Sequence, residues 1–318
     1  MGQAGPRKVR RMHIGISCYD QAVDDLVTLG GAAEEFGFDS LWLGEHVLAP
    51  MAYASTHPTQ PGESGRAGHK GSSDHNGKPI VDPSVLLADP LIALAAVAAR
   101  TTTVRLATGI YLLPLRHPLL AARAVATLAE LSNGRFALGI GSGWLREEFE
   151  ALGVPFAGRT ARLEEQLAVI RAALRGGPFA FHGEHYDIDT VQVRPTSVHA
   201  PLVLGGNTEP ALARAVRLAD GWFTSGIPTL EEALRLRDRI DQLCTETGRT
   251  EPFETTWRIA APDAELVERY AAEGLENLLV MKYDVWDGDD LDARRTSLAT
   301  AADHLGLRSV TVSNGAHA

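Results

Sequence analysis

Short apolar runs alternate with longer segments of helical periodicity along most of the chain. Runs of this kind are typical of buried strands, and we expect eight of them. They cover residues 9–18, 40–47, 104–113, 135–140, 201–204, 222–224, 255–260 and 278–282. Amphipathic helices are expected at residues 20–37, 89–100, 118–131, 147–152, 161–174, 209–219, 230–247, 264–273 and 291–305.

This alternation predicts parallel strands with helices packed outside them. Eight such units in about 250–320 residues favour an α/β fold closed as a (β/α)8 TIM barrel. We expect a single domain that spans residues 1–318. An open, doubly wound sheet is the alternative, but the first β–α turn lacks the GxGxxG phosphate motif of that fold.

Two stretches interrupt the alternation. Residues 50–90 form a long polar insertion after the second strand, rich in Gly, Ser, Pro and His. Residues 179–195 alternate as a β-hairpin does and precede the fifth strand. Loops of this length are usually functional or mobile. Because the first lies on the catalytic side of a barrel, we expect it to form a lid.

Composition narrows the partners of the chain. Hydrophobic residues make up 45% and charged residues 22%, as in a folded protein with a sizeable core. The formal net charge of -10 opposes binding to nucleic acid and to anionic membrane surfaces. Two cysteines form no disulfide framework. No secretion signal and no run of about 20 apolar residues is present, so a cytoplasmic location is expected.

Glu45 and His46 stand side by side at the end of the second predicted strand. In a barrel, residues at the carboxyl ends of the strands face the active site. His46 is the best candidate for proton transfer, because only histidine has an unperturbed pKa near neutrality. A hydrogen-bonded histidine at the rim is the alternative. Glu45 points the other way along the strand, and we expect it to act as a structural partner.

Glycine-rich turns end the fourth and fifth predicted strands. They read Gly141-Ser142-Gly143 and Gly206-Asn207-Thr208, and Thr208 is a plausible N-cap. Backbone N–H groups in such turns can point at a phosphate. The alternative is that these glycines only make tight β–α turns. Two such turns on adjacent strands favour an anion site.

Other chemistries have less support. His57, His69, Asp74 and His75 in the insertion match no zinc spacing, and we interpret them as a solvated loop. Metal-dependent barrel hydrolases carry a His-x-His pair at the end of the first strand, whereas this chain reads ISCY at residues 16–19. Neither cysteine lies near an obvious base in the sequence, so a cysteine nucleophile is not indicated.

Four segments resemble signatures of the luciferase-like monooxygenase superfamily. Residues 38–46 read FDSLWLGEH, and residues 108–118 read TGIYLLPLRHP. Residues 132–148 read SNGRFALGIGSGWLREE, and residues 204–222 read LGGNTEPALARAVRLADGW. They are similar to the second, third, fourth and fifth strand regions of the superfamily and cover most of residues 10–226. The C-terminal third carries little signature.

The strings RHP, GSGWLREEF and HGEHYDID look most like actinobacterial-type oxidoreductases that are predicted to use the deazaflavin coenzyme F420. This resemblance implies a non-prolyl cis peptide at Gly109-Ile110 behind the deazaflavin ring and places His46 close to the reactive carbon of the ring. It also implies that backbone groups of the two glycine turns hold the phosphate. The predicted cofactor-binding residues are Glu45, Gly109, Ile110, Gly141, Ser142, Gly143, Gly206, Asn207 and Thr208.

The chain departs from part of this family at Trp144. Some deazaflavin dehydrogenases of this fold have a glutamate directly after the second glycine of the fourth-strand turn, and tryptophan cannot act as an acid or base. Dehydrogenation of a sugar phosphate is therefore doubtful, and Trp144 is better suited to wall a substrate pocket. The residues expected to line the substrate are Tyr111, Arg116, His117 and Trp144.

The resemblance implies hydride transfer between F420 and a small organic substrate in a homodimeric enzyme. The first alternative is an FMN-dependent two-component monooxygenase, which takes reduced flavin from a partner flavin reductase and activates O2. The second is a flavin-binding protein without catalysis. The sequence separates the two cofactors poorly, because both present a phosphate and a tricyclic ring.

Overall fold

The computed structural model describes residues 11–55, 57, 81, 83–195, 199–261 and 263–307. Within these residues, eight parallel strands close into a barrel in the order β1-β10-β9-β8-β7-β4-β3-β2, which confirms the predicted (β/α)8 fold. The barrel strands are β1 (His13–Cys18), β2 (Ser40–Leu43), β3 (Arg105–Thr108), β4 (Phe136–Ile140), β7 (Leu202–Gly205), β8 (Gly221–Phe223), β9 (Glu254–Arg258) and β10 (Asn277–Met281).

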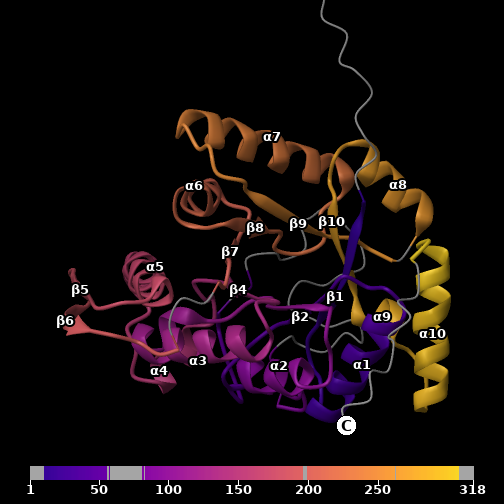
Figure 1. The fold of residues 1–318 in the computed structure, drawn as a ribbon, viewed down its shortest axis with the longest axis horizontal. Helices are drawn as coiled ribbons and strands as arrows, with labels where there is room; N and C mark the ends of the chain where they lie inside the picture. The colour runs from indigo at the N-terminus through magenta and orange to yellow at the C-terminus, as the bar shows by residue number, and fades with distance from the viewer. Residues whose placement is uncertain are drawn as a thin grey trace, which may run out of the picture.

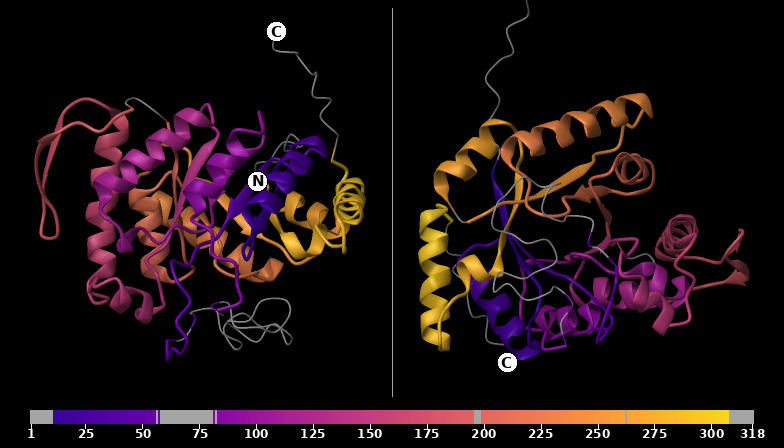
Figure 2. Two further views of the ribbon diagram at one scale, coloured as in Figure 1. Left: turned by 90° about the horizontal axis from the view of Figure 1, so that it is seen from below. Right: turned by 180° about the vertical axis from the view of Figure 1, so that it is seen from behind.

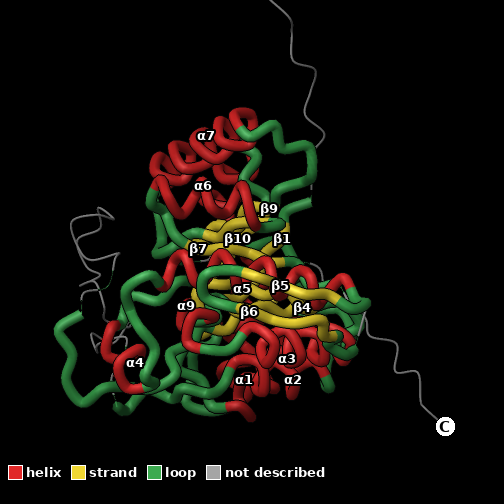
Figure 3. Tube along the Cα trace, turned by 90° about the vertical axis from the view of Figure 1, so that its left-hand side faces the viewer, coloured by secondary structure: helices red, strands yellow, loops and turns green. Residues whose placement is uncertain are grey.

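Helices surround the barrel (Figures 1 and 2). They are α1 (Val23–Glu35), α2 (Pro90–Ala98), α3 (Pro118–Leu131), α4 (Arg146–Ala151), α5 (Arg159–Arg175), α6 (Glu209–Leu218), α7 (Leu230–Glu246), α8 (Ala264–Ala272), α9 (Lys282–Val285) and α10 (Leu291–His304). Figure 3 shows strands between α6 and α7 on one side and α1, α2 and α3 on the other. Across the described ranges, none of the helices has the length and apolar character that crossing a bilayer demands.

Local sequence signals explain where several helices begin and end. Asp89 caps α2 by accepting hydrogen bonds from the N–H groups of Leu91 and Ile92, and a proline follows it at the first helical position. Thr229 and Glu232 form a capping box at the start of α7. After α3, Asn133 adopts a positive φ of 53°, which ends the helix and turns the chain into β4.

The second and third predicted strands are shorter than expected. β2 ends at Leu43 and β3 ends at Thr108. Directly after β3 the Gly109–Ile110 peptide bond is cis, at the position that the family resemblance implied. Beyond this bulge, Tyr111 rejoins the barrel through an isolated parallel bridge to Ile140. The residues of this bulge are packed against the barrel, so the apolar run in the sequence extends beyond the end of β3.

The hairpin prediction is confirmed. β5 (Phe179–His182) and β6 (Asp187–Val191) pair antiparallel and project from the barrel beside α5 (Figure 1). Glu165 of α5 holds the tip by accepting hydrogen bonds from the backbone N–H groups of Glu184, His185 and Tyr186. Of the insertion at residues 50–90, most lies outside the described residues, so the lid remains a prediction there.

Large and small side chains alternate inside the barrel. Trp42 and Phe223 fill its centre with their ring centroids 5.4 Å apart. Ala107 and Ala137 lie in the same cluster and leave room for these rings. The interior is therefore a packed core, and chemistry is confined to its two ends.

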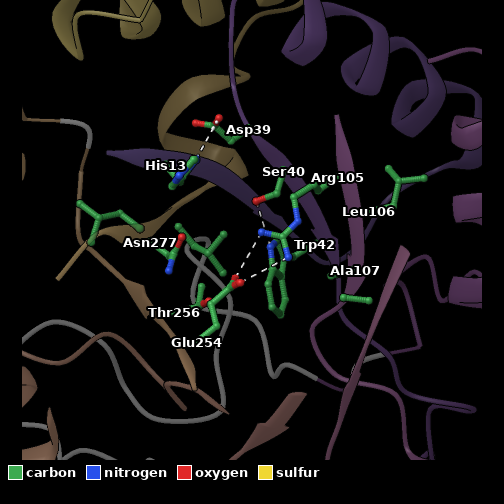
Figure 4. Close-up of a pocket in the computed structure, with 13 residues that line it drawn as sticks. His13, Asp39, Ser40, Trp42, Arg105, Leu106, Ala107, Glu254, Thr256 and Asn277 are labelled. Atoms are coloured by element: carbon green, nitrogen blue, oxygen red, sulfur yellow. Dashed lines mark hydrogen bonds and ion pairs between the residues drawn. The ribbon is translucent and has the colours of Figure 1, made fainter. Parts of the chain in front are cut away.

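Charged residues close the amino end of the barrel. Figure 4 shows a pocket there, lined by the first residues of several strands. The guanidinium group of Arg105 lies 3.3 Å from Glu254, and His13 lies 3.3 Å from Asp39. The cavity has room for about one water molecule. It lies opposite the carboxyl ends of the strands, so we assign it a structural role.

A buried carboxylate and a partly buried arginine hold the turn that leads into β3. The Glu34 carboxylate accepts hydrogen bonds from the backbone N–H groups of Thr102, Thr103 and Val104 at 2.6–3.1 Å. Arg135 donates to the carbonyl oxygens of this segment from the other side, including Val104 at 2.8 Å. Burial raises the pKa of Glu34, but the N–H donors outweigh it and the net pKa is lowered.

We expect Glu34→Gln to lower the free energy of unfolding at pH 7 by about 1–3 kcal/mol, because an amide nitrogen would face N–H donors. Since the folded pKa of Glu34 is lowered, its charged form stabilises the fold above the unfolded pKa. The difference between wild type and variant should therefore shrink as the pH falls through the folded pKa. Urea unfolding at several pH values measures both.

The neighbouring residue supplies the control. Glu35 is half exposed and pairs with Arg295 on the surface, so Glu35→Gln should cost less than about 1 kcal/mol. Equal destabilisation by the two variants, or a Glu34→Gln effect independent of pH, would contradict the assignment.

Candidate active site

The carboxyl ends of the strands meet at one mouth of the barrel. This geometry brings together His46 after β2, Ile110 after β3, the turn at residues 141–144 after β4, the turn at residues 205–208 after β7, and Arg258 at the end of β9. Because the strands are parallel, these segments lie together although they span more than half of the chain. The mouth is the candidate active site.

Ile110 fits between the two glycine turns. A Cβ atom on Gly141 would lie 2.0 Å from Ile110 Cδ1, and one on Gly205 would lie 3.4 Å from Ile110 Cγ2. β4 and β7 are paired neighbours, with Ile140 opposite Leu204, so both turns border the bulge. Glycine at residue 141 therefore leaves room for Ile110 in its present position, and the bulge forms a wall of the mouth.

The turn after β4 presents unused donors. Among the described residues, no hydrogen bond uses the N–H groups of Ser142 and Gly143. Gly143 has φ of +78°, a conformation that glycine adopts without steric cost. Two adjacent N–H groups in such a turn can bind an anion.

The turn after β7 is held from below. The Asn207 side chain pairs with the backbone of Ser225 through two hydrogen bonds, of 2.8 and 2.9 Å. Thr208 occupies the N-cap position of α6, but its side chain makes no capping hydrogen bond. The Asn207 side chain therefore has a structural role, whereas the Thr208 hydroxyl is not used as a cap. The predicted cofactor role of this turn stays a prediction.

Two arginines beside the β4 turn were not singled out from the sequence. Arg159 Nε donates to the carbonyl oxygen of Gly143 at 3.0 Å. The guanidinium groups of Arg159 and Arg146 lie over the Phe156 ring, 3.8 and 4.4 Å from its centroid. Burial, followed by the charge of Arg146, lowers the pKa of Arg159. In the described part of the chain neither arginine forms an ion pair, so this basic pair is available to an anion.

A buried carboxylate orients His46. The His46 Nδ1 atom lies 2.7 Å from Glu148 Oε2, and both side chains are almost fully buried. The other oxygen, Oε1, accepts a hydrogen bond from the Val47 N–H at 2.6 Å. Because a carboxylate can only accept, this pairing places the hydrogen on Nδ1 and leaves Nε2 for a reacting group.

An aromatic cage surrounds His46. The rings of Tyr19 and Trp144 contact it edge-on at centroid distances of 6.2 and 5.6 Å. His57 contacts Trp144 from the other side at 5.1 Å. Our interpretation of His57 as part of a solvated loop is therefore wrong, because the start of the insertion packs on the mouth. His69, Asp74 and His75 lie outside the described residues.

Backbone contacts fix the start of the insertion. The N–H groups of Ala54 and Ser55 donate to Glu147 Oε1 at 2.8 and 3.2 Å, and the N–H of Arg146 donates to Ser55 Oγ at 3.0 Å. These contacts attach residues 54 and 55 to the first turn of α4. His57 lies two residues further along the chain, where its ring contacts Trp144.

Glu45 is turned away from His46 and forms a second cluster. Its carboxylate pairs with Arg116 and accepts a hydrogen bond from the Leu112 N–H at 2.7 Å. The guanidinium of Arg116 lies 4.3 Å from the centroid of the buried Tyr111 ring. The structural partnership expected for Glu45 is thus present. A cofactor contact of Glu45 and substrate contacts of Tyr111 and Arg116 stay predictions.

His117 lies at the start of α3. Its Nδ1 atom accepts a hydrogen bond from the Leu119 N–H at 3.3 Å, and its ring contacts Tyr186 of the hairpin at 5.6 Å. The structure thus brings His117 to the hairpin, and no described ring contact joins it to His46. Its predicted substrate role is untested.

A buried thiol lies below the mouth. Burial raises the pKa of Cys18 to about 12, so the group is an unreactive thiol at neutral pH. Within the described residues, no cluster of three or more His, Cys, Asp or Glu side chains could hold a metal ion.

Residues 9–279 match the family described as luciferase-like monooxygenase. An uncharacterized protein of Mycobacterium tuberculosis is 35% identical over 240 residues, which cover 74% of this chain and 78% of that protein. An F420-dependent glucose-6-phosphate dehydrogenase of Nakamurella multipartita is 30% identical over 75% of this chain and 66% of its own length.

One further relative uses a different cofactor, and one solved structure has the same fold. An FMNH2-dependent dimethylsulfone monooxygenase of Pseudomonas fluorescens is 36% identical, but over 35% of this chain and 31% of that protein. The crystal structure of the monooxygenase RslO1 from Streptomyces bottropensis superposes with a TM-score of 0.65 at 19% identity. It covers 92% of this chain and 98% of RslO1, a likeness that shows the fold.

We expect the His57 ring to remain neutral down to a pH of about 4. Burial, followed by the charges of His46 and Arg258, lowers its pKa from 6.5 to about 4. Since the folded pKa is below the unfolded one, this residue destabilises the fold as the pH falls from 6.5. An NMR pH titration of the ring signals, assigned with His57→Gln, measures the value.

A second variant separates the causes. Arg258→Met should raise the pKa of His57, because it removes a neighbouring positive charge, but burial should still hold it below 6.5. Titration of the wild-type ring near 6.5 would show that His57 does not pack on the mouth.

Proposed function

The chain belongs to the luciferase-like monooxygenase family, and on this basis we propose that it is an oxidoreductase that uses coenzyme F420 at the mouth of its barrel. The observation that carries this proposal is the position of Ile110 between two glycine turns, one of which has unused N–H donors. A planar ring against the bulge and a phosphate at the turn would fit this arrangement.

The residues present fit such a group. The N–H groups of Ser142 and Gly143, with the backbone of Asn207 and the hydroxyl of Thr208, would hold the phosphate. Arg159 lies beside this turn through its bond to Gly143 and adds positive charge. When bound, F420 supplies or accepts a hydride, and the protein provides orientation and exclusion of water.

His46 would hold or move the proton that accompanies hydride transfer. Its Nδ1 atom is bound to Glu148, so the proton would pass at Nε2. The Glu148 carboxylate holds the imidazole ring of His46 in one orientation, as the aspartate of a Ser-His-Asp triad does. Tyr19 and Trp144 exclude water around the ring, and Trp144 would wall the substrate.

The basic pair favours F420 over FMN. FMN ends at its phosphate, whereas F420 carries glutamate carboxylates beyond it. Arg159, bonded to the turn at Gly143, and Arg146, which shares the Phe156 ring with it, would offer positive charge to such carboxylates. The F420-dependent relative also matches three quarters of the chain, whereas the FMNH2-dependent one matches about a third.

An FMN-dependent monooxygenase is the second candidate, because the FMNH2-dependent relative has the higher identity over its segment. It would require a flavin reductase as a partner. Oxygen consumption with reduced FMN distinguishes the two, since a deazaflavin hardly reacts with oxygen. The small-molecule substrate, the homodimer, the single-domain organisation and the cytoplasmic location remain predictions.

We expect purified protein to bind oxidised F420 more tightly than FMN in a fluorescence titration. Arg159→Met should weaken F420 binding by about 10- to 100-fold, as loss of a charge-assisted contact does. Arg175→Met, at the opposite end of the same helix, should leave it unchanged. Tighter FMN binding would favour the monooxygenase, and binding of neither would contradict the proposal.

We expect His46→Ala to reduce turnover by about 10²- to 10⁴-fold while F420 affinity stays nearly intact. The loss removes proton transfer, whereas the ring and phosphate contacts remain. Steady-state kinetics with a substrate found by screening, together with the fluorescence titration, measure both. His304→Ala, on the exposed end of α10, is the control, and unchanged turnover in His46→Ala would exclude this role.

A further inference from the structure

Arg258 points into the barrel at the active-site end of β9. Side chains alternate along a strand, and Glu254, Thr256 and Arg258 share the inward face. Glu254 and Thr256 line the amino-end pocket, so Arg258 is the next inward side chain toward the mouth. Trp257 between them is buried in the outer core.

The contacts of Arg258 leave its charge uncompensated. Its Nη2 atom donates to the carbonyl oxygen of Gly109 at 3.1 Å, and its guanidinium carbon lies 5.1 Å from the centroid of the Phe223 ring. The Nε atom is enclosed and has no hydrogen-bond partner among the described residues. A carbonyl dipole and a ring face replace only part of what water gives a cation.

Nearby carboxylates are engaged elsewhere. Glu148 pairs with His46, and Glu45 pairs with Arg116. The acidic group that acts on the charge of Arg258 is the phenol of Tyr283. Burial lowers the pKa of Arg258 to about 10, so it remains a cation at neutral pH. Arg258 is partly buried and forms no ion pair among the described residues, so a bound anion would offset the cost of removing its charge from water.

We propose that Arg258 is the anchor for a carboxylate on the substrate. The planar guanidinium matches a carboxylate with two parallel hydrogen bonds. His57 lies close enough for the charge of Arg258 to act on it, which places Arg258 on the side of His57 and Trp144. The substrate class is therefore a small organic acid.

Arg258 lies on a different strand from the two glycine turns. The turns follow β4 and β7, whereas β9 is separated from β7 by β8. Arg258 donates a hydrogen bond to the carbonyl oxygen of Gly109 in the cis peptide. A carboxylate bound to Arg258 would therefore lie near the bulge. The reaction assigned to this acid rests on the proposed function, but binding of the carboxylate does not.

The test uses benzoate and its neutral isostere benzamide, titrated into the full-length protein by calorimetry, with and without F420. We expect benzoate to bind at least about 10-fold more tightly than benzamide. Arg258→Met should weaken benzoate by about 10- to 100-fold and leave benzamide unchanged. Arg258→Lys keeps the positive charge but loses the two-pronged guanidinium group, so its benzoate affinity should lie between those of the wild type and Arg258→Met.

Arg123→Met, on the exposed face of α3, controls for the loss of one charge and should change nothing. Thermal unfolding checks that each variant is folded, and Arg258→Lys carries the comparison if the methionine variant is not. Equal binding of benzoate and benzamide, binding of neither, or unchanged benzoate affinity in both Arg258 variants would overturn the proposal.

A further outcome distinguishes the source of the anion. If Arg258→Met weakened reduced F420 and left benzoate unaffected, the cation would belong to the cofactor ring and the proposal would fail. If benzoate binding depended on Arg258 and F420 did not bind at all, the anion site would stand and the proposed function would fail.

Discussion

The mouth of the barrel depends on the space that Gly141 leaves for the Ile110 side chain. Ile110 packs against Gly141 and Gly205, so the end of β3 lies directly against the turns that follow β4 and β7. A Cβ atom at residue 141 would meet Ile110 Cδ1 at 2.0 Å, so the Ile110 side chain would have to leave its present position. The packing of one side chain therefore sets the distance between the end of β3 and these two turns.

Two adjacent residues divide the charges of this region. Glu45 pairs with Arg116 outside the mouth, and His46 pairs with Glu148 inside it. Both of these buried carboxylates thus pair with a residue far along the chain, and the cations Arg159 and Arg258 form no ion pair among the described residues. Although the net charge of the protein is -10, Arg159 and Arg258 bring positive charge to this region. A low-dielectric environment strengthens the attraction of such cations for anions.

Much of the fold could be predicted, because periodicity reports which side of an element is buried. All eight barrel strands and the hairpin at residues 179–195 formed where the apolar pattern placed them. The second and third strands were predicted to extend too far, because the packed loops that follow them have the same apolar pattern as a buried strand. His46 and the glycine turns were accessible to the same logic, because they directly follow strands.

The sequence by itself determined the order of elements, the parallel barrel and the family, since these follow from local pattern and from motifs of adjacent residues. Only the tertiary structure decided the pairing of His46 with Glu148, the packing of His57 on Trp144, and the lack of a described hydrogen-bond partner for Arg258 Nε. These features join residues as many as 149 positions apart, as the bond from Arg258 to Gly109 does. Whether a charged side chain has a partner depends on every element that closes around it, and no local pattern records that.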